Sequence, residues 1–215
     1  MKTLDVAEAA RIIDRMDGGI DGPDVVETID LRGVQAAMLK RGILYIAGTN
    51  EFSDWFEFNF DFIHDRAPDA HGFRMAPGDS GALWHAGFLE HAQIVYAFAK
   101  PQKPAFIIGH SLGGASAQIV GASLSVPSLS FGSPRPYHGR AHFGREGFVL
   151  NICRTDDTLC HLPPRFFGFR HIGSVHWLNP PAHDVEEGHS IESYAKLLED
   201  GPLPASFPKA WPPTG

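Results

Sequence analysis

The sequence predicts an α/β fold, with a mostly parallel sheet flanked by helices. Short apolar segments of strand length alternate with segments of helical periodicity along the chain. An apolar strand at 105–109 runs through a sharp turn into a small-residue helix at 112–124, which is a strand–helix unit of a parallel sheet. The length of 215 residues suits one domain, which we place at 1–200, followed by a proline-rich tail at 201–215.

The first predicted elements are a helix and two strands. Asp5 can cap a helix over 5–16, whose apolar side chains fall on one face. Residues 34–39 and 43–47 have the apolar character of strands, and the break at 40–42 predicts a hairpin connection.

The next segment is rich in phenylalanine. Residues 56–62 alternate phenylalanine with polar residues, so they predict a strand with the rings on one face. Residues 64–82 contain several prolines and glycines and little periodicity, which predicts a long loop, and such loops tend to be functional. A helix over 87–99 is expected to stop before Pro101.

The last third of the chain completes the alternation. Strands are predicted at 128–131, 148–153 and 171–178, and a final helix at 189–198. The five prolines of the tail predict an extended or loosely packed segment.

Composition excludes several classes of function. The net charge is −7 and no run of lysine or arginine stands out, which argues against a nucleic-acid partner. The start of the chain lacks the pattern of a secretory signal, and no apolar stretch approaches the roughly 18 residues of a transmembrane segment. These features slightly favour a cytoplasmic location.

No cofactor or metal is expected. The two cysteines, Cys153 and Cys160, have the spacing of neither a zinc ribbon nor a CxxC pair, and reduced thiols are favoured over a bridge. The His-Asp pairs at 64–65 and 183–184 have no recognised metal-ligand spacing. No phosphate-binding glycine loop is present.

The strongest motif is Gly109-His110-Ser111-Leu112-Gly113-Gly114. A strand that turns sharply into a helix leaves its turn residue in a crowded backbone conformation, and glycines two positions on either side relieve the clash. The motif therefore predicts Ser111 as a nucleophile at the carboxyl edge of the sheet. His110 is excluded as its base, because adjacent side chains at such a turn diverge.

Several segments resemble, in the same order, those of the class 3 (fungal-type) lipase family of the α/β-hydrolase superfamily. They span roughly 34–198 and comprise the elbow, Ala47-Gly48-Thr49, Asp54-Trp55, Trp84-His85-Ala86-Gly87-Phe88, Phe131-Gly132-Ser133-Pro134-Arg135, Leu162-Pro163-Pro164 and His189-Ser190-Ile191-Glu192-Ser193-Tyr194. The resemblance implies an α/β-hydrolase fold and hydrolysis of lipid esters through an acyl-enzyme.

The acid and base of a catalytic triad should follow the serine in that order. Asp156 and Asp157 both lie at the end of a predicted strand, and the register to the prolines at 163–164 favours Asp157. Among the later histidines, His189 opens the final helix in a segment similar to the family's H-x-x-Y, with one extra residue, and His183 is the alternative.

The resemblance also implies an oxyanion hole and a lid. The backbone N–H groups of Leu112 and Thr49 are expected to bind the oxyanion. Phe52, Trp55 and Phe56 follow where the family carries a lid, and would contact substrate or a lipid interface transiently; packing in the core is the alternative.

The predicted function is therefore a serine lipase or esterase that acts on lipid esters. An esterase of non-lipid substrates and a non-catalytic binding module on the hydrolase fold remain the alternatives. Oligomeric state is left open.

Overall fold

The computed structural model describes residues 2–48, 73–79, 81–142, 144–185 and 187–213. Thr49, Phe52, Trp55, Phe56 and the predicted strand at 56–62 lie outside the described residues, so those expectations stay predictions.

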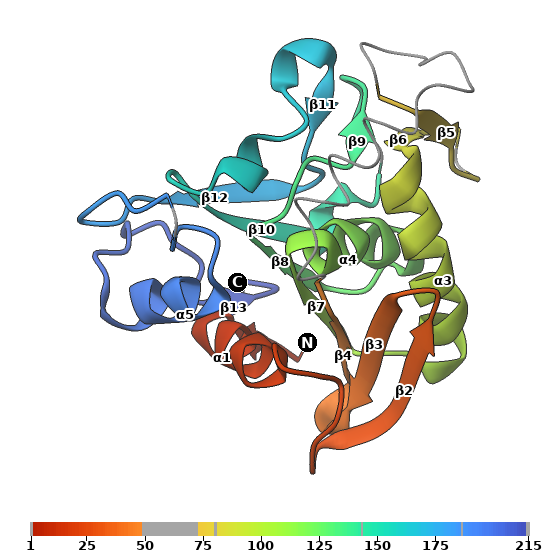
Figure 1. Cartoon of the computed structure of the whole chain (residues 1–215), viewed down its shortest axis with the longest axis horizontal. Helices are drawn as coiled ribbons and strands as arrows, with labels where there is room; N and C mark the ends of the chain where they lie inside the picture. Colours follow the sequence, from red (N-terminus) through yellow and green to blue (C-terminus); the bar gives the residue numbers. More distant parts are fainter. Residues whose placement is uncertain (1, 49–72, 80, 143, 186, 214–215) are drawn as a thin grey trace.

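A seven-stranded sheet forms the centre of the described molecule (Figure 1). Its neighbouring strands are, in order, β12 (Ser174–Leu178), β10 (Val149–Arg154), β8 (Ser128–Phe131), β7 (Phe106–His110), β4 (Ile43–Ile46), β3 (Val34–Leu39) and β2 (Val25–Leu31). The strands from β12 to β4 pair in parallel, and β3 and β2 add antiparallel at one edge. The predicted α/β class and mostly parallel sheet are confirmed.

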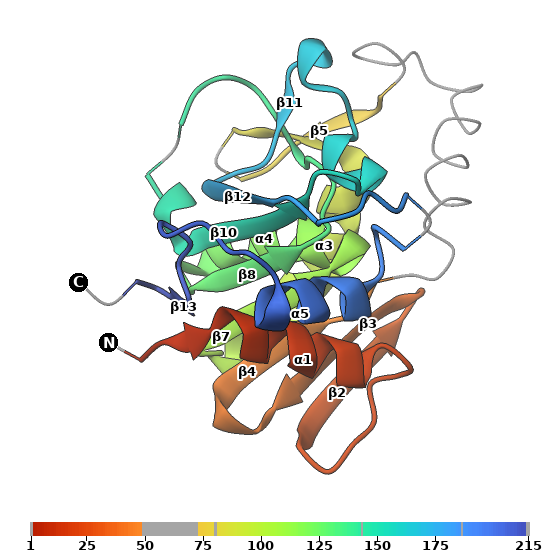
Figure 2. The same ribbon diagram turned by 90° about the vertical axis from the view of Figure 1, so that its left-hand side faces the viewer.

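Helices cover both faces of this sheet (Figure 2). The helices α1 (Val6–Met16) and α5 (Ile191–Asp200) pack together on one face, and α3 (Ala86–Gln102) and α4 (Ser111–Leu124) pack on the other. Each face has its own apolar core, with Ile13, Tyr45 and Tyr194 in one and Leu44, Phe88 and Ile107 in the other. Asp5 caps α1, since its carboxylate accepts a hydrogen bond from the backbone of Glu8 at 2.8 Å.

Short elements complete the described fold. A small four-stranded sheet has the order β11 (Phe169–Arg170), β9 (Tyr137–His138), β6 (Leu83–His85) and β5 (Met75–Pro77), and β1 (Leu4–Asp5) pairs with β13 (Ala210–Trp211). The 3-10 turns are η1 (Lys40–Gly42), η3 (Glu146–Phe148), η4 (Thr158–His161) and η5 (Arg165–Phe167).

The structure corrects three sequence-based expectations. The loop predicted over 64–82 contains β5 in its described part. The helix α3 passes Pro101 by one residue, because the proline lies in the last turn. The C-terminal tail is not loosely packed, since Phe207 and Trp211 are buried in the core beside α1 and α5, with 7% and 8% of their surface exposed.

Gly113 lets the start of α4 pack directly on the end of β4. A Cβ atom at this position would lie 2.3 Å from the carbonyl oxygen of Ile46 and 2.7 Å from that of Ala47. These are backbone atoms of a buried strand, so they cannot move aside as a flexible side chain could.

We therefore expect Gly113→Ala to lower the free energy of unfolding by about 3 kcal/mol, as overpacking a core does. Urea denaturation measures the change. Gly147→Ala is the control, because a Cβ atom at exposed Gly147 would meet nothing within 4 Å. Equal stability of the two variants would contradict the close packing of α4 on β4.

Candidate active site

Ser111 lies at the turn between β7 and α4, as the glycine motif predicts. Its backbone adopts a φ of +57°, a left-handed conformation that few residues other than glycine take. Gly109 makes the turn feasible, because a Cβ atom there would lie 2.4 Å from the carbonyl oxygen of Gly113. The sharp turn holds the serine at the carboxyl edge of the sheet, between a buried strand and the N-terminus of a helix.

His189 meets this serine from a segment 78 residues further along the chain. Its Nε2 atom lies 3.0 Å from the Oγ atom of Ser111. His189 precedes α5, and its side chain is 29% exposed. The hydroxyl of Ser111 is therefore within hydrogen-bond distance of an imidazole nitrogen.

Asp157 lies behind the histidine ring. It follows β10, its side chain is fully buried, and its Oδ2 atom lies 3.0 Å from Nδ1 of His189. The same oxygen accepts a hydrogen bond from the hydroxyl of Tyr194 at 2.8 Å, and Oδ1 accepts one from the backbone of Leu159 at 3.0 Å. Burial opposes ionisation, yet the hydrogen bonds and charge of His189 and the bond from Tyr194 lower the pKa of Asp157 below its ordinary value.

The competing candidates lie elsewhere. The carboxylate of Asp156 binds the guanidinium of Arg154, so it is engaged away from the histidine ring. His183 is exposed on the loop before α5. The structure thus brings together the three residues favoured by the sequence, Ser111, Asp157 and His189, and their catalytic roles are taken up below as a proposal.

His110 is a contact of the base that sequence reasoning missed. Its ring stacks on that of His189 with centroids 4.6 Å apart, and its Nε2–H donates to the backbone carbonyl of His189 at 2.8 Å. Burial lowers the pKa of His110 to about 3, so the ring is neutral at ordinary pH. A neutral ring whose N–H is already bonded supports the position of His189. Sequence gave no signal for this contact, because it joins residues 79 positions apart.

The predicted oxyanion hole is only partly described. Leu112 is the second residue of α4, where backbone N–H groups have no partner within the helix. Gly48 approaches the same point from β4, since a Cβ atom on it would lie 3.2 Å from Cβ of Ser111. Thr49 lies outside the described residues, so its role stays a prediction.

Both cysteines are free and buried close to Asp157. The thiol of Cys160 lies 3.5 Å from Oδ2 of Asp157, and that of Cys153 lies 3.9 Å from Nε2 of His171. The expectation of two unbridged thiols agrees with this arrangement. Within the described ranges, no group of three or more potential ligands could hold a metal ion.

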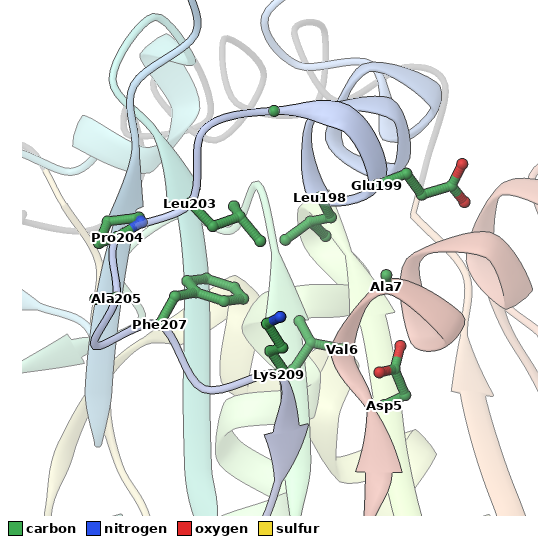
Figure 3. Close-up of a pocket in the computed structure, with 11 residues that line it drawn as sticks. Asp5, Val6, Ala7, Leu198, Glu199, Leu203, Pro204, Ala205, Phe207 and Lys209 are labelled. Carbon is green, nitrogen blue, oxygen red and sulfur yellow. The ribbon is translucent and has the colours of Figure 1, made fainter.

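A separate cavity of about 520 Å³ opens at the far end of α5 (Figure 3). Val6, Leu198 and Phe207 supply apolar walls, and Asp5 and Lys209 bring opposite charges to it. None of the triad residues lines it, and His189 precedes the opposite end of the same helix.

The described part of the chain contains no helix with the length and apolar character needed to span a bilayer.

Comparisons with known proteins relate the chain to fungal enzymes. No family model matches. Secreted mono- and diacylglycerol lipase 1 of Fusarium solani is 30% identical over 160 residues, which cover 65% of this chain and 44% of that protein. A lipase of Rhizopus niveus is 32% identical over 129 residues, covering 49% of this chain and 33% of that protein. The chain thus spans less than half the length of these relatives.

Solved structures show the fold. Lipase II from Rhizopus niveus superposes with a TM-score of 0.58 at 23% identity, covering 80% of this chain and 77% of that one. The mono- and diacylglycerol lipase of Aspergillus oryzae gives a TM-score of 0.56 at 15% identity, covering 83% and 79%. The α/β-hydrolase fold implied by the sequence motifs is confirmed.

The relatives also correct the expected location. The sequence slightly favoured the cytoplasm, but the Fusarium relative is named as a secreted protein, so that expectation is wrong. It rested on the lack of a signal pattern and of a long apolar stretch, and neither carries information on location in a chain that spans 44% of its relative.

The similarity in sequence and the similarity in structure therefore agree. The sequence matches are to fungal lipases, and the fold is the one that fungal lipases share. The chain is a homologue of fungal lipases and has the α/β-hydrolase fold.

Proposed function

We propose that this chain is a serine carboxylic-ester hydrolase that acts on lipid esters. One observation carries the proposal: a continuous hydrogen-bonded relay, with steps of 3.0 Å each, runs from Ser111 through His189 to a buried carboxylate at Asp157. This arrangement supports Ser111 as nucleophile, His189 as base and Asp157 as the acid that orients the base, the three groups that a serine hydrolase needs in this order.

In the acylation step, the Oγ atom of Ser111 attacks the ester carbonyl carbon. Its proton passes to Nε2 of His189, which the 3.0 Å contact allows. Asp157 keeps the other ring nitrogen protonated and stabilises the imidazolium that forms. The imidazolium then gives its proton to the departing alcohol, which leaves an acyl group on Ser111.

Water completes the reaction. His189 removes a proton from the water molecule as its oxygen attacks the acyl carbon, and it returns the proton to Ser111 as the acid is released. Both tetrahedral intermediates carry a negative oxygen. The N-terminal end of α4 offers the N–H of Leu112 and the positive end of the helix dipole to that oxygen. Thr49 is the predicted second donor.

The proposed substrate class rests on the relatives. The Fusarium relative is named for mono- and diacylglycerols, and the Rhizopus relative is named a lipase. Lipid esters are therefore favoured over soluble, non-lipid esters. Phe52, Trp55 and Phe56 remain the predicted residues for transient contact with a lipid surface.

A fluorophosphonate probe tests the nucleophile. The probe forms a covalent bond only with an activated serine, so we expect one equivalent to attach to the wild-type chain and none to Ser111→Ala. Mass spectrometry of the intact proteins measures the addition, and circular dichroism checks that both are folded. A folded wild-type chain that stays unlabelled would leave the non-catalytic binding module as the better description.

Turnover then separates the two esterase classes. We expect hydrolysis of emulsified diacylglycerol, measured by titration of released fatty acid, and loss of that activity in Ser111→Ala. Rapid cleavage of soluble short-chain nitrophenyl esters without any release from emulsified acylglycerol would identify an esterase of non-lipid substrates instead.

A further inference from the structure

The base His189 lies on a segment with little packing of its own. Residues 179–190 connect β12 to α5, and residues 181–185 and 187 are all exposed. A ring that must lie within hydrogen-bond distance of two fixed partners cannot depend on an unanchored loop, because a misplacement of about 1 Å can cost a hundredfold in rate. Something buried must fix this loop.

Besides His110, which contacts His189 itself, the buried residue Asp156 contacts this loop. The carboxylate of Asp156 accepts a hydrogen bond from the backbone N–H of Asp184 at 3.1 Å. The loop passes over Asp156 a second time at Gly188, where a Cβ atom would lie 2.9 Å from the carbonyl oxygen of Asp156. Asp184 and Gly188, which both precede His189 in this loop, therefore contact the same residue, Asp156.

Arg154 holds that carboxylate in place. Its Nε and Nη2 atoms donate to the two oxygens of Asp156 at 3.0 and 2.8 Å. The side chains are 6% and 0% exposed. A buried ion pair contributes little net stability, because the cost of removing both charges from water offsets their attraction. Two parallel hydrogen bonds do fix the orientation of a carboxylate, and the pair thereby directs one oxygen at the loop.

Hydrogen bonds within the loop connect Asp184 to the residues beside His189. The backbone of Glu187 donates to the side chain of Asp184 at 3.2 Å, and the backbone of Ser190 donates to the carbonyl of Glu187 at 3.1 Å. The segment from Asp184 to Ser190 is thus internally bonded. A shift at Asp184 would therefore move His189.

We infer that Asp156, clamped by Arg154, is a positioning residue that sets the place of His189 between Asp157 and Ser111. The inference rests on the proposed function, because it assigns Asp156 a role in that reaction. Both aspartates follow β10. Asp157 binds the ring of His189, and Asp156 binds the backbone of the loop that carries His189.

Asp156→Asn tests the inference. The carboxylate accepts two hydrogen bonds from Arg154 and one from Asp184 on its two oxygens, whereas an amide has a single oxygen. One nitrogen of Arg154 would then face an NH2 group, so the side chain is no longer clamped in one orientation and its contact with the loop loosens. We expect kcat for a soluble nitrophenyl ester to fall by about 10- to 100-fold, with KM within about twofold of wild type, because the loop misplaces the base rather than the substrate. Rates are referred to the folded fraction measured by circular dichroism.

Glu146→Gln is the matched control. Glu146 precedes β10 and Asp156 follows it, and Glu146 likewise binds an arginine, Arg170, in a pair whose side chains are 8% and 18% exposed. The substitution breaks a comparable ion pair at the opposite end of the same strand, so a loss of stability alone would appear here too. We expect kcat within about twofold of wild type.

Gly188→Ala provides a second route if Asp156→Asn fails to fold. It leaves the Arg154–Asp156 pair intact, but the added Cβ atom would lie 2.7 Å from the carbonyl oxygen of Asp184 and 2.9 Å from that of Asp156, so the loop must shift on Asp156. We expect a similar fall in kcat. The double variant should lose less than the product of the two single losses, because both changes disturb the packing of the same loop on the same residue.

The outcomes are distinguishable. Wild-type kcat in Asp156→Asn, or in Gly188→Ala where the first variant does not fold, overturns the inference while a labelled wild-type chain still supports the proposed function. An equal fall in Glu146→Gln also overturns it. A wild-type chain that neither turns over ester nor reacts with fluorophosphonate refutes the proposed function, and this inference with it.

Discussion

His189→Ala is expected to lower kcat/KM for ester hydrolysis by about three decades or more. The reason is geometric. The ring of His189, the proposed base, lies within hydrogen-bond distance of the Ser111 hydroxyl, at 3.0 Å. Without it the serine proton has no acceptor, and attack on the carbonyl slows accordingly. Steady-state kinetics with a soluble nitrophenyl ester measure the loss.

His183→Ala is the appropriate control, since His183 is an exposed histidine on the same loop. It should retain activity close to that of wild type. Equal and mild losses in the two variants would contradict the assignment of the base. A larger loss in His183→Ala would transfer the role to His183.

Asp157→Asn is expected to lower kcat by about four decades while the protein stays folded. The asparagine side chain fits the same space, but its amide nitrogen would face Nδ1 of His189 at the place where a carboxylate oxygen now lies at 3.0 Å. The histidine would then carry its proton on Nε2, pointing at Ser111, and could not accept the serine proton. Single-turnover kinetics with thermal unfolding of the same sample separate the chemical loss from a loss of fold.

Tyr194→Phe tests whether the charge of Asp157 or the hydrogen bond that orients its carboxylate matters more for kcat. It removes the 2.8 Å hydrogen bond to Asp157 and the 2.9 Å bond that the hydroxyl accepts from the backbone of Arg154, but it leaves the carboxylate and the tautomer of His189 unchanged. A much smaller loss is expected than for Asp157→Asn. If the two variants lost equally, orientation of Asp157 by its neighbours would matter more than its charge.

Sequence patterns within single elements predicted several strands and the turn at Ser111. The strand at 34–39 and the strand at 128–131 have their predicted bounds in β3 and β8. β3 is mostly apolar, and β8 alternates serine with large apolar residues, and both patterns are typical of strands. The turn at Ser111 followed from two glycines whose Cβ positions are occupied by backbone atoms. Chain order and motif register then selected Asp157 and His189, which the structure places together.

The parts that sequence did not predict depend on distant contacts. β2 was missed because its side chains are mostly exposed, so it shows no apolar run or regular alternation. The buried tail was missed because prolines indicate a lack of regular structure and do not indicate exposure, as Phe207 shows. The roles of His110 and Asp156 arise from contacts with a loop far along the chain, which no local pattern encodes.

The antiparallel contact of β1 with β13 has a practical consequence for engineering. Leu4 and Trp211 are paired, so the first and last strands of the described residues are already neighbours, and a short linker could join them at little entropic cost. New ends could then be opened at the turn around Gly18, where the backbone is exposed. Such a circular permutant would reverse the order in which α1 and α5 are synthesised while keeping the nucleophile, the base and their supporting loop in one uninterrupted stretch.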